Sequence, residues 1–358
     1  MGAVTTASFS VEQNEKIKKL ASDYNEIKQQ IGKRIVGLDP VIELILISIF
    51  SGSHSLLVGV PGLAKTLLVS TMASLLELKM SRIQFTPDLM PSDITGAEVI
   101  LMNSETGQRE FKFLPGPIFA HMILADEINR TPPKTQSALI EAMEEKQISS
   151  LGRTLKLEPP FVVLATLNPI EMEGTYSLPA AQLDRFLFRI PLDYPTRENE
   201  YQILIMTTSL QSVQLKPILT RQEILDYIEL SRKISIEDRV MDYAVQLIRN
   251  TRPDEKQVIP LIREYVQWGV GTRACQGLIL GAKTRAMLYG RTTVTTEDIR
   301  SLILPVLGHR MILNYQAEVD GITVEYLIQD LLQKVPCFNW APPKTKKKRS
   351  FWKFGSKV

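Results

Sequence analysis

The spacing of apolar residues changes along the chain, from helical intervals near the N-terminus to short continuous runs. This change divides the chain into parts with different predicted structures. After Ser10, which stands in capping-box spacing with Gln13, apolar residues recur at helical intervals. From there to about residue 195, short apolar runs alternate with helical stretches, as in a parallel sheet that is buried on both faces. We expect strands over residues 55–60, 82–85, 122–125, 161–167 and 186–192.

Beyond Pro195 the strand pattern fades, and helix signals replace it. Thr220 with Glu223, and Thr295 with Asp298, have the spacing of N-terminal helix caps. We therefore predict four parts. They are an amphipathic helix over 1–33 that packs on the core, an α/β core over 34–198, a smaller helical domain over 199–335, and a basic, disordered tail over 336–358.

Composition narrows the class of protein. The 358 residues suffice for about two domains, and 44% hydrophobic with 23% charged residues is ordinary globular usage. Two cysteines exclude a disulfide framework and a cysteine-based zinc site, which favours a reducing cytoplasm. No apolar run is long enough to cross a bilayer, and the N-terminus lacks the features of a secretory signal.

The net charge of +3 is unevenly distributed. Residues 344–358 carry seven Lys or Arg and no acid, so the rest of the chain carries −4. An acidic body argues against nucleic acid as a partner. In the tail, cations are interleaved with Phe351, Trp352 and Phe354, which suits weak contact with the inner face of an anionic membrane. A solvated chain end is the alternative.

The strongest chemical signal is the segment GVPGLAKT between a predicted strand and a predicted helix, which is the context of a phosphate-binding loop. Small residues let backbone N–H groups surround phosphate oxygens, and the helix N-terminus adds positive potential. We expect Lys65 to reach the β- and γ-phosphates and Thr66 to ligate Mg²⁺. Ala64 replaces the usual glycine, which we expect to require a negative φ there. The predicted ATP-binding residues of this segment are Gly59, Pro61, Gly62, Leu63, Ala64, Lys65, Thr66 and Leu67.

Polar residues follow two further predicted strands. Asp126 and Glu127 come directly after one, and Asn168 follows another. Ligands bind at the carboxyl ends of strands in open α/β sheets. We therefore expect Asp126 to hold hydrated Mg²⁺, Glu127 to polarise the attacking water, and Asn168 to orient it. The alternatives are an acidic helix start for the pair and an Asn-Pro turn for Asn168.

On these segments the chain resembles the AAA+ ATPases and, within them, the MoxR family. The resemblance rests on GVPGLAKT, LADEINRTPPKTQSALIEAMEEKQI, LATLNP, LPAAQLDRFLFRI, GVGTRACQGLILGAKTRA and TEDIRSLILPVLGHR. It implies an α/β fold, with an αβα core around a five-stranded parallel sheet of order 5-1-4-3-2, and a C-terminal all-helical lid. It also implies Mg²⁺-dependent ATP hydrolysis between the subunits of a hexameric ring.

The resemblance also implies roles for residues outside the phosphate loop. Arg185 matches the arginine finger that completes a neighbouring subunit's site, and Arg189 is its rival. Arg273 matches the sensor 2 arginine that contacts the γ-phosphate, and Val36 and Gly37 match part of the adenine pocket.

Two insertions also look family-like. Residues 86–96 resemble a helix-2 insertion, and residues 111–117 end a hairpin near the ring face. Ordinary surface loops are the alternative for both.

The function implied by the resemblance is a chaperone-like ATPase that remodels or matures a client protein, with metal insertion as one form of maturation. The family's usual partners contain a von Willebrand factor A domain. The alternatives are an ATP-gated scaffold or regulator whose hydrolysis is incidental, and a nucleic-acid motor, which the acidic body disfavours. We expect the protein in the cytoplasm, or peripheral at the inner face of the membrane.

Overall fold

The structure is a computed structural model that describes residues 9–102, 109–150, 153–170, 175–208, 214–256 and 258–337. The basic segment 344–358 lies outside these ranges, so the expectations about it stay predictions.

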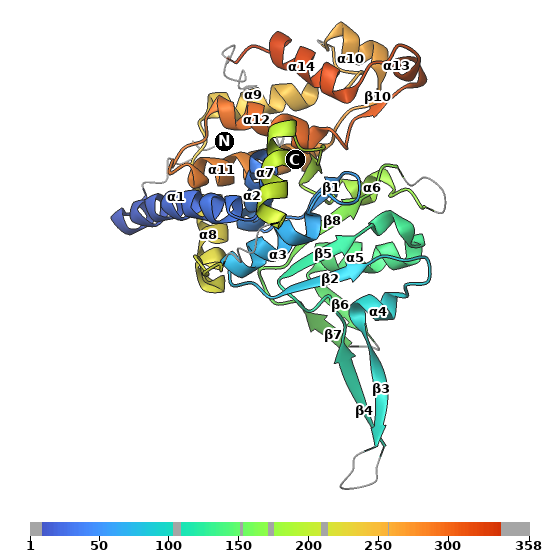
Figure 1. The fold of residues 1–358 in the computed structure, drawn as a ribbon. Helices are drawn as coiled ribbons and strands as arrows, with labels where there is room; N and C mark the ends of the chain where they lie inside the picture. Colours follow the sequence, from blue (N-terminus) through green and yellow to red (C-terminus); the bar gives the residue numbers. More distant parts are fainter. Residues whose placement is uncertain are drawn as a thin grey trace, which may run out of the picture.

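A five-stranded parallel sheet lies at the centre of the core (Figure 1). The strands lie in the order β2-β5-β8-β1-β9, and all neighbouring pairs run parallel. Counting only these five along the chain, the order from β9 is 5-1-4-3-2, which confirms the prediction. The strands are β1 (Ser55–Val58), β2 (Met80–Gln84), β5 (Met122–Asp126), β8 (Val162–Leu167) and β9 (Phe188–Pro191).

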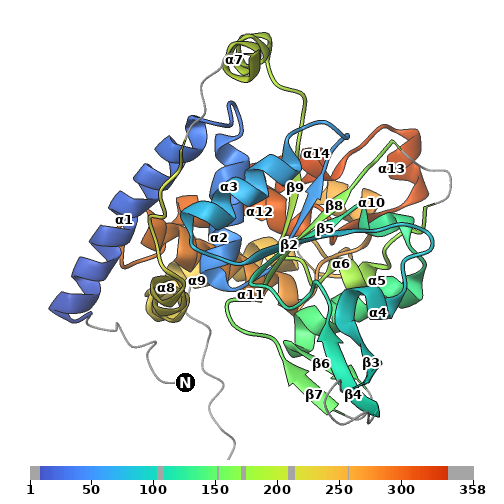
Figure 2. The same ribbon diagram turned by 60° about the horizontal axis from the view of Figure 1, so that its bottom comes forward.

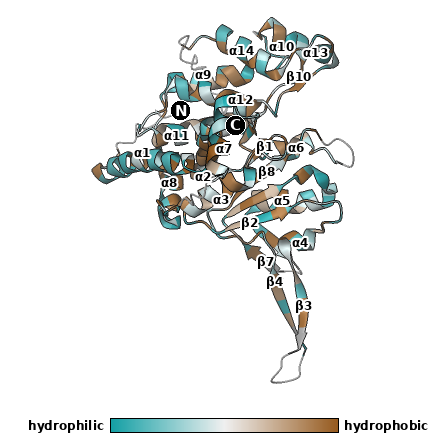
Figure 3. Cartoon of the chain, viewed as in Figure 1, coloured by the Kyte–Doolittle hydropathy of each residue, from teal (hydrophilic) through white to brown (hydrophobic). Residues whose placement is uncertain are grey.

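Helices α2 and α3 contact the sheet directly, and apolar residues of both belong to the buried core around it. Helix α2 is buried along most of its length, and Figure 3 colours much of it as hydrophobic. The helices are α1 (Val11–Gly32), α2 (Asp39–Ser51), α3 (Lys65–Leu75), α4 (Pro91–Thr95), α5 (Pro133–Glu145) and α6 (Ala180–Leu183), with the short 3₁₀ turn η1 (Ile128–Arg130).

Helix α1 begins with the predicted capping box. The Gln13 N–H donates to the Ser10 hydroxyl, and the Ser10 N–H donates to the Gln13 side chain, both at 3.1 Å. The apolar side of α1 packs against α11 and α3. The buried residues on that side are Ile17, Leu20, Tyr24, Ile27 and Ile31.

A long antiparallel hairpin extends from the body of the core (Figure 1). It pairs β3 (Gly96–Met102) with β4 (Arg109–Pro115), so residues 111–117 end a hairpin as expected. Two glycines close its base. A Cβ atom on Gly96 would lie 2.3 Å from the Leu114 carbonyl oxygen, and one on Gly116 would lie 2.3 Å from the Ile94 carbonyl oxygen. A second, shorter hairpin pairs β6 (Gln147–Ser150) with β7 (Arg153–Lys156).

The C-terminal part of the chain is helical, and the caps predicted at Thr220 and Thr295 are present. It also contains a small antiparallel sheet that the sequence did not predict, between β10 (Val266–Trp268) and β11 (Ile312–Leu313). Helix α7 has no buried residue; Asn199 in its first turn lies next to Gly37, and the helix projects from the rest of the molecule in Figure 2. None of the described helices is both long and apolar enough to cross a membrane. The helices are α7 (Arg197–Thr208), α8 (Arg221–Lys233), α9 (Asp238–Arg249), α10 (Pro260–Tyr265), α11 (Thr272–Leu288), α12 (Thr296–Leu307), α13 (Tyr315–Val319) and α14 (Val324–Lys334).

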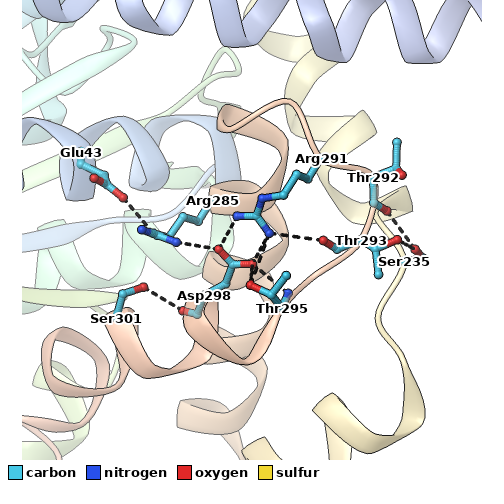
Figure 4. Close-up of polar contacts among 9 residues, drawn as sticks. All are labelled: Glu43, Ser235, Arg285, Arg291, Thr292, Thr293, Thr295, Asp298 and Ser301. Atoms are coloured by element: carbon cyan, nitrogen blue, oxygen red, sulfur yellow. Dashed lines mark hydrogen bonds and ion pairs between the residues drawn. The ribbon is translucent and has the colours of Figure 1, made fainter.

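A buried carboxylate joins the helical part to the core (Figure 4). Asp298 on α12 is fully buried and accepts hydrogen bonds from Arg285 and Arg291, each at 2.7 Å. Arg285 also donates to Glu43 on α2 at 2.9 Å. Burial alone would raise the pKa of Asp298, but the hydrogen bonds from Arg291, the Thr295 N–H and Arg285 outweigh it and hold the pKa below its ordinary value.

Candidate functional site

The phosphate loop connects the end of β1 to the first residue of α3, Lys65. A Cβ atom on Gly59 would lie 2.6 Å from the carbonyl oxygen of Leu192, so the close approach of the chain after β9 requires glycine there. Gly62 has a φ of +88°, and a Cβ atom on it would meet no atom within 4 Å. The Lys65 ammonium group donates to the Gly59 carbonyl, so it folds back across the loop.

The expectation for Ala64 is wrong. Its backbone has φ 53° and ψ 23°, the left-handed conformation, instead of a negative φ. Alanine pays roughly 1 to 2 kcal/mol for this conformation relative to the right-handed one. The loop before it and the helix that begins at Lys65 hold the residue there, so the geometry of the loop overrides the preference of a single side chain.

Thr166 organises two acidic residues, Asp126 at the end of β5 and Glu127 directly after it. Its hydroxyl donates to Asp126 Oδ1 at 2.7 Å and accepts the Glu127 N–H at 2.8 Å. The other carboxylate oxygen of Asp126 accepts two hydrogen bonds from Arg82, at 2.7 and 3.2 Å. The Asp126 carboxylate is thus fixed in direction by strands on both sides of β5.

Glu127 is held by its backbone and by its side chain. It has a φ of 58°, so it too is in the left-handed conformation. Its Oε2 accepts hydrogen bonds from Arg130 at 2.9 Å and from the Gln84 amide at 3.1 Å. Strained backbone that the surroundings enforce is typical of functional sites.

A cleft of about 400 Å³ brings the loop and the strand ends together. Asn168 lies in it and is 6% exposed, and its Oδ1 accepts the Ile170 N–H at 3.2 Å, so the turn expected as an alternative is also present. Burial lowers the pKa of Lys65, and the charges of Asp126 and Glu127 offset part of that shift. The cleft is lined by Pro61, Gly62, Leu63, Ala64, Lys65, Thr66, Leu67, Arg82, Gln84, Asp126, Glu127 and Asn168.

The residues of this cleft fit ATP and Mg²⁺. The open space beside Gly62 and the helix N-terminus at Lys65 suit phosphate groups. Thr66 and Asp126 offer the hard oxygen ligands that Mg²⁺ prefers. Among the described residues, no group of three His, Cys, Asp or Glu could hold a metal ion by itself. Mg²⁺ is usually held by one or two protein ligands together with phosphate oxygens. Thr66 and Asp126 fit this kind of site.

The predicted adenine pocket is not brought into this cleft. Neither Val36 nor Gly37 is among its lining residues. Gly37 has a φ of +80°, and a Cβ atom on it would lie 2.2 Å from the Asn199 amide nitrogen on α7. Their role therefore stays a prediction.

Arg185 and Arg273 lie together in a second cleft of about 270 Å³, which shares no lining residue with the first. Arg185 forms an ion pair with Glu144 at the end of α5. Arg273, at the start of α11, lies 3.2 Å from the other oxygen of Glu144 and 3.7 Å from Asp184. The structure therefore does not bring Arg273 to the phosphate loop of its own chain.

A buried arginine from the helical part holds the segment that carries Arg185. Arg310, whose side chain is 5% exposed, donates to the Asp184 carboxylate at 2.7 Å and to the backbone carbonyls of Asp184, Phe186 and Leu187. Arg189 lies elsewhere, with its guanidinium group 3.8 Å from Glu325 on α14. The second cleft thus contains Arg185 and not its rival.

Several residues that line the two clefts, and one that supports the first, were not identified from the sequence. Arg82 and Gln84 flank the buried Ile83 on β2, and that alternation was the signal for a polar face. Thr166 is a polar residue inside an apolar run, two positions before Asn168. Glu144 carried no such signal, because its partners lie 41 and 129 positions away.

Comparison with known proteins covers most of the chain. Residues 54–188 match the ATPase family associated with various cellular activities (AAA), and residues 260–331 match an AAA lid domain. The chain is 42% identical over 306 residues to the Chaperone MoxR1 of Mycobacterium tuberculosis, covering 86% of this chain and 80% of that protein. It is 39% identical over 311 residues to the uncharacterized protein YeaC of Bacillus subtilis, covering 86% and 92%. A crystal structure of a predicted ATPase from Cytophaga hutchinsonii superimposes with a TM-score of 0.83 at 40% identity, covering 90% of this chain and 97% of that one.

Proposed function

We propose, for a chain that belongs to the MoxR family of AAA+ ATPases, that it hydrolyses ATP at the interfaces between subunits and thereby remodels or matures a client protein. One observation carries the proposal. The phosphate loop, Asp126 and Glu127 lie in one cleft, whereas Arg185 and Arg273 lie in another on the same chain. A complete set of these groups around one nucleotide therefore needs two chains.

The first cleft would bind the nucleotide and prepare the water. Lys65 would leave the Gly59 carbonyl and donate to the phosphates, while Thr66 and Asp126 would hold Mg²⁺. Bound Mg²⁺ neutralises charge on the phosphate oxygens. Glu127 would accept a hydrogen bond from the attacking water. Arg130 and Gln84 set the direction of its carboxylate.

The second cleft would complete the site of the next subunit. Arg185 would donate to the γ-phosphate across the interface, and such a finger contributes about 10³ to 10⁵ in rate. Because Arg273 lies beside Arg185, we assign it to the same neighbouring nucleotide.

Repeating this head-to-tail contact generates a closed ring when the rotation between subunits permits, and we propose a hexamer. The proposed client is a protein with a von Willebrand factor A domain, matured by remodelling or metal insertion. We propose that the protein works in the cytoplasm, with weak contact to the membrane surface through residues 344–358 and no nucleic-acid partner.

The variant Glu127→Gln tests the assignment of the first cleft. Without the carboxylate, ATP should bind with unchanged affinity while hydrolysis falls by about 10²- to 10⁴-fold, the usual contribution of a general base. Calorimetric ATP binding and phosphate release measure the two effects. Glu141→Gln, an exposed glutamate on α5, is the matched control.

Normal turnover in Glu127→Gln would contradict the proposal. The scaffold alternative predicts that client binding follows ATP occupancy and stays intact in the same variant whether or not hydrolysis continues.

A further inference from the structure

One carboxylate, that of Glu144, lies between Arg185 and Arg273, two of the three arginines that line the second cleft. Glu144 Oε2 pairs with Arg185, and Glu144 Oε1 lies 3.2 Å from Arg273. The arginines come from different parts of the chain, since Arg185 follows α6 in the core and Arg273 is on the lid helix α11. Glu144 thus pairs with one arginine of the core and one of the lid, whereas the other carboxylate of the cleft, Asp184, pairs among the described residues only with lid arginines.

The positive charges of Arg185 and Arg273 explain why a carboxylate is needed between them. Two guanidinium groups side by side repel each other, and a carboxylate that accepts from both offsets this repulsion and sets their spacing. Arg185 also donates to the Ile140 carbonyl at 3.3 Å, so α5 holds its guanidinium at two points. The side chains of Arg185, Glu144 and Arg273 are 28%, 40% and 51% exposed, which leaves the group accessible to another molecule.

The helix that carries Glu144 is anchored at both ends. Near its start, the Gln136 amide donates to the carbonyls of Ile128 and Thr131, in the segment directly after Glu127. Near its end, the Met143 carbonyl accepts from the buried ring of His54 at 3.2 Å, and the same ring accepts the Val163 N–H from β8 at 3.0 Å. Helix α5, which carries Glu144, is therefore held to the sheet by hydrogen bonds through His54.

We propose that Glu144 is a positioning residue, whose carboxylate sets the spacing and direction of the two arginines that this chain presents to its neighbour's nucleotide. The inference rests on the proposed function. Glu144 does not line the first cleft, so it would contact neither a nucleotide nor a water bound there.

The first test compares Glu144→Gln with Glu145→Gln. Glu145 is the next residue of α5, is exposed, and makes no ion pair with any described residue. In Glu144→Gln we expect kcat to fall roughly ten- to a hundredfold, since a finger displaced by about 1 Å loses that much. The KM for ATP should change less than about twofold, because other residues bind the nucleotide. Glu144→Asp, which keeps the charge, should retain more activity than Glu144→Gln.

The second test mixes two defective variants. A Glu127→Gln subunit keeps its arginines and Glu144, while a Glu144→Gln subunit keeps its phosphate loop and Glu127. In a random equal mixture, one interface in four then combines intact parts, so the rate should recover to about a quarter of wild type. A mixture of Arg185→Ala with Glu127→Gln shows whether subunits exchange and complement each other.

The outcomes distinguish a failure of the role assigned to Glu144 from a failure of hydrolysis between subunits. An unchanged or raised rate in Glu144→Gln would overturn the inference. So would a mixture with Glu127→Gln that stays inactive while the Arg185→Ala mixture recovers, since Glu144 would then act within its own chain. Full activity in Arg185→Ala, or no recovery in either mixture, would instead count against hydrolysis between subunits.

Discussion

At the scale of single residues, two backbones in the left-handed conformation lie on the walls of the nucleotide cleft. Ala64 has a φ of 53° and Glu127 a φ of 58°, and both line the cleft. Each conformation costs roughly 1 to 3 kcal/mol, which the surrounding structure must supply. The surrounding structure thus holds the backbone of both residues before any nucleotide binds, whereas the Lys65 side chain would have to leave the Gly59 carbonyl.

Two buried histidines make the stability of the protein depend on pH. Burial lowers the pKa of His54 to about 4, and burial with the nearby charge of Arg310 lowers the pKa of His309 to about 3. In the unfolded chain both titrate near 6.5, so the unfolded state binds more protons as pH falls below that value. The stabilisation is complete above pH 6.5 and is lost as pH falls toward the folded pKa values.

We expect the urea midpoint of unfolding to fall steadily between pH 7 and pH 5, with each histidine contributing about 2 kcal/mol of lost stability at pH 5. His309→Gln should show a smaller fall over the same range. Equal slopes in the variant and the wild type would contradict this origin of the pH dependence.

The site residues that could be predicted from the sequence are those that adjoin the apolar strands. Asp126 and Asn168 follow such runs, and parallel strands bring their carboxyl ends to one edge. The alternation of β2 indicated that Arg82 lies on a polar face but not that it pairs with Asp126, and Glu144 carried no signal, because its partners are distant along the chain. The place of Arg273 depends on how the lid packs on the core, which no local pattern encodes.

At the scale of elements, the Asp298 ion-pair group links the lid helices to α2. Glu43, Arg285, Arg291 and Asp298 bring together three helices and the loop before α12. The strands of the central sheet and the capped helices were predictable because their apolar runs and caps are local. The β10–β11 pair was not, since strands of three and two residues are too short to show a period.

Asp298→Asn should lower the free energy of unfolding by about 3 to 5 kcal/mol, because it leaves Arg285 and Arg291 without their shared buried partner. The measurement is urea unfolding followed by circular dichroism. Glu297→Gln, one residue earlier and exposed, should change the same quantity by less than about 0.5 kcal/mol. Equal midpoints for the two variants would show that this group does not stabilise the fold.

At the scale of the whole molecule, the two clefts of the chain share no lining residue, and we propose that each is one half of an ATPase site. The cleft with the phosphate loop lies at the carboxyl edge of the sheet, and the arginine cleft lies between the end of α5 and the start of α11. A single chain should therefore bind ATP but hydrolyse it poorly. Assembly is part of the catalytic mechanism in this account, because it brings Arg185 of one chain to the phosphate loop of another.

The most direct test of this account is the ATPase rate per subunit, measured over a wide range of protein concentration. We predict a rate that rises with concentration to a plateau in the wild type. In Arg185→Ala the rate should be at least about 10³-fold lower than in the wild type at every concentration, although ATP still binds. A rate per subunit that is the same at all concentrations, and that Arg185→Ala does not reduce, would contradict hydrolysis at subunit interfaces.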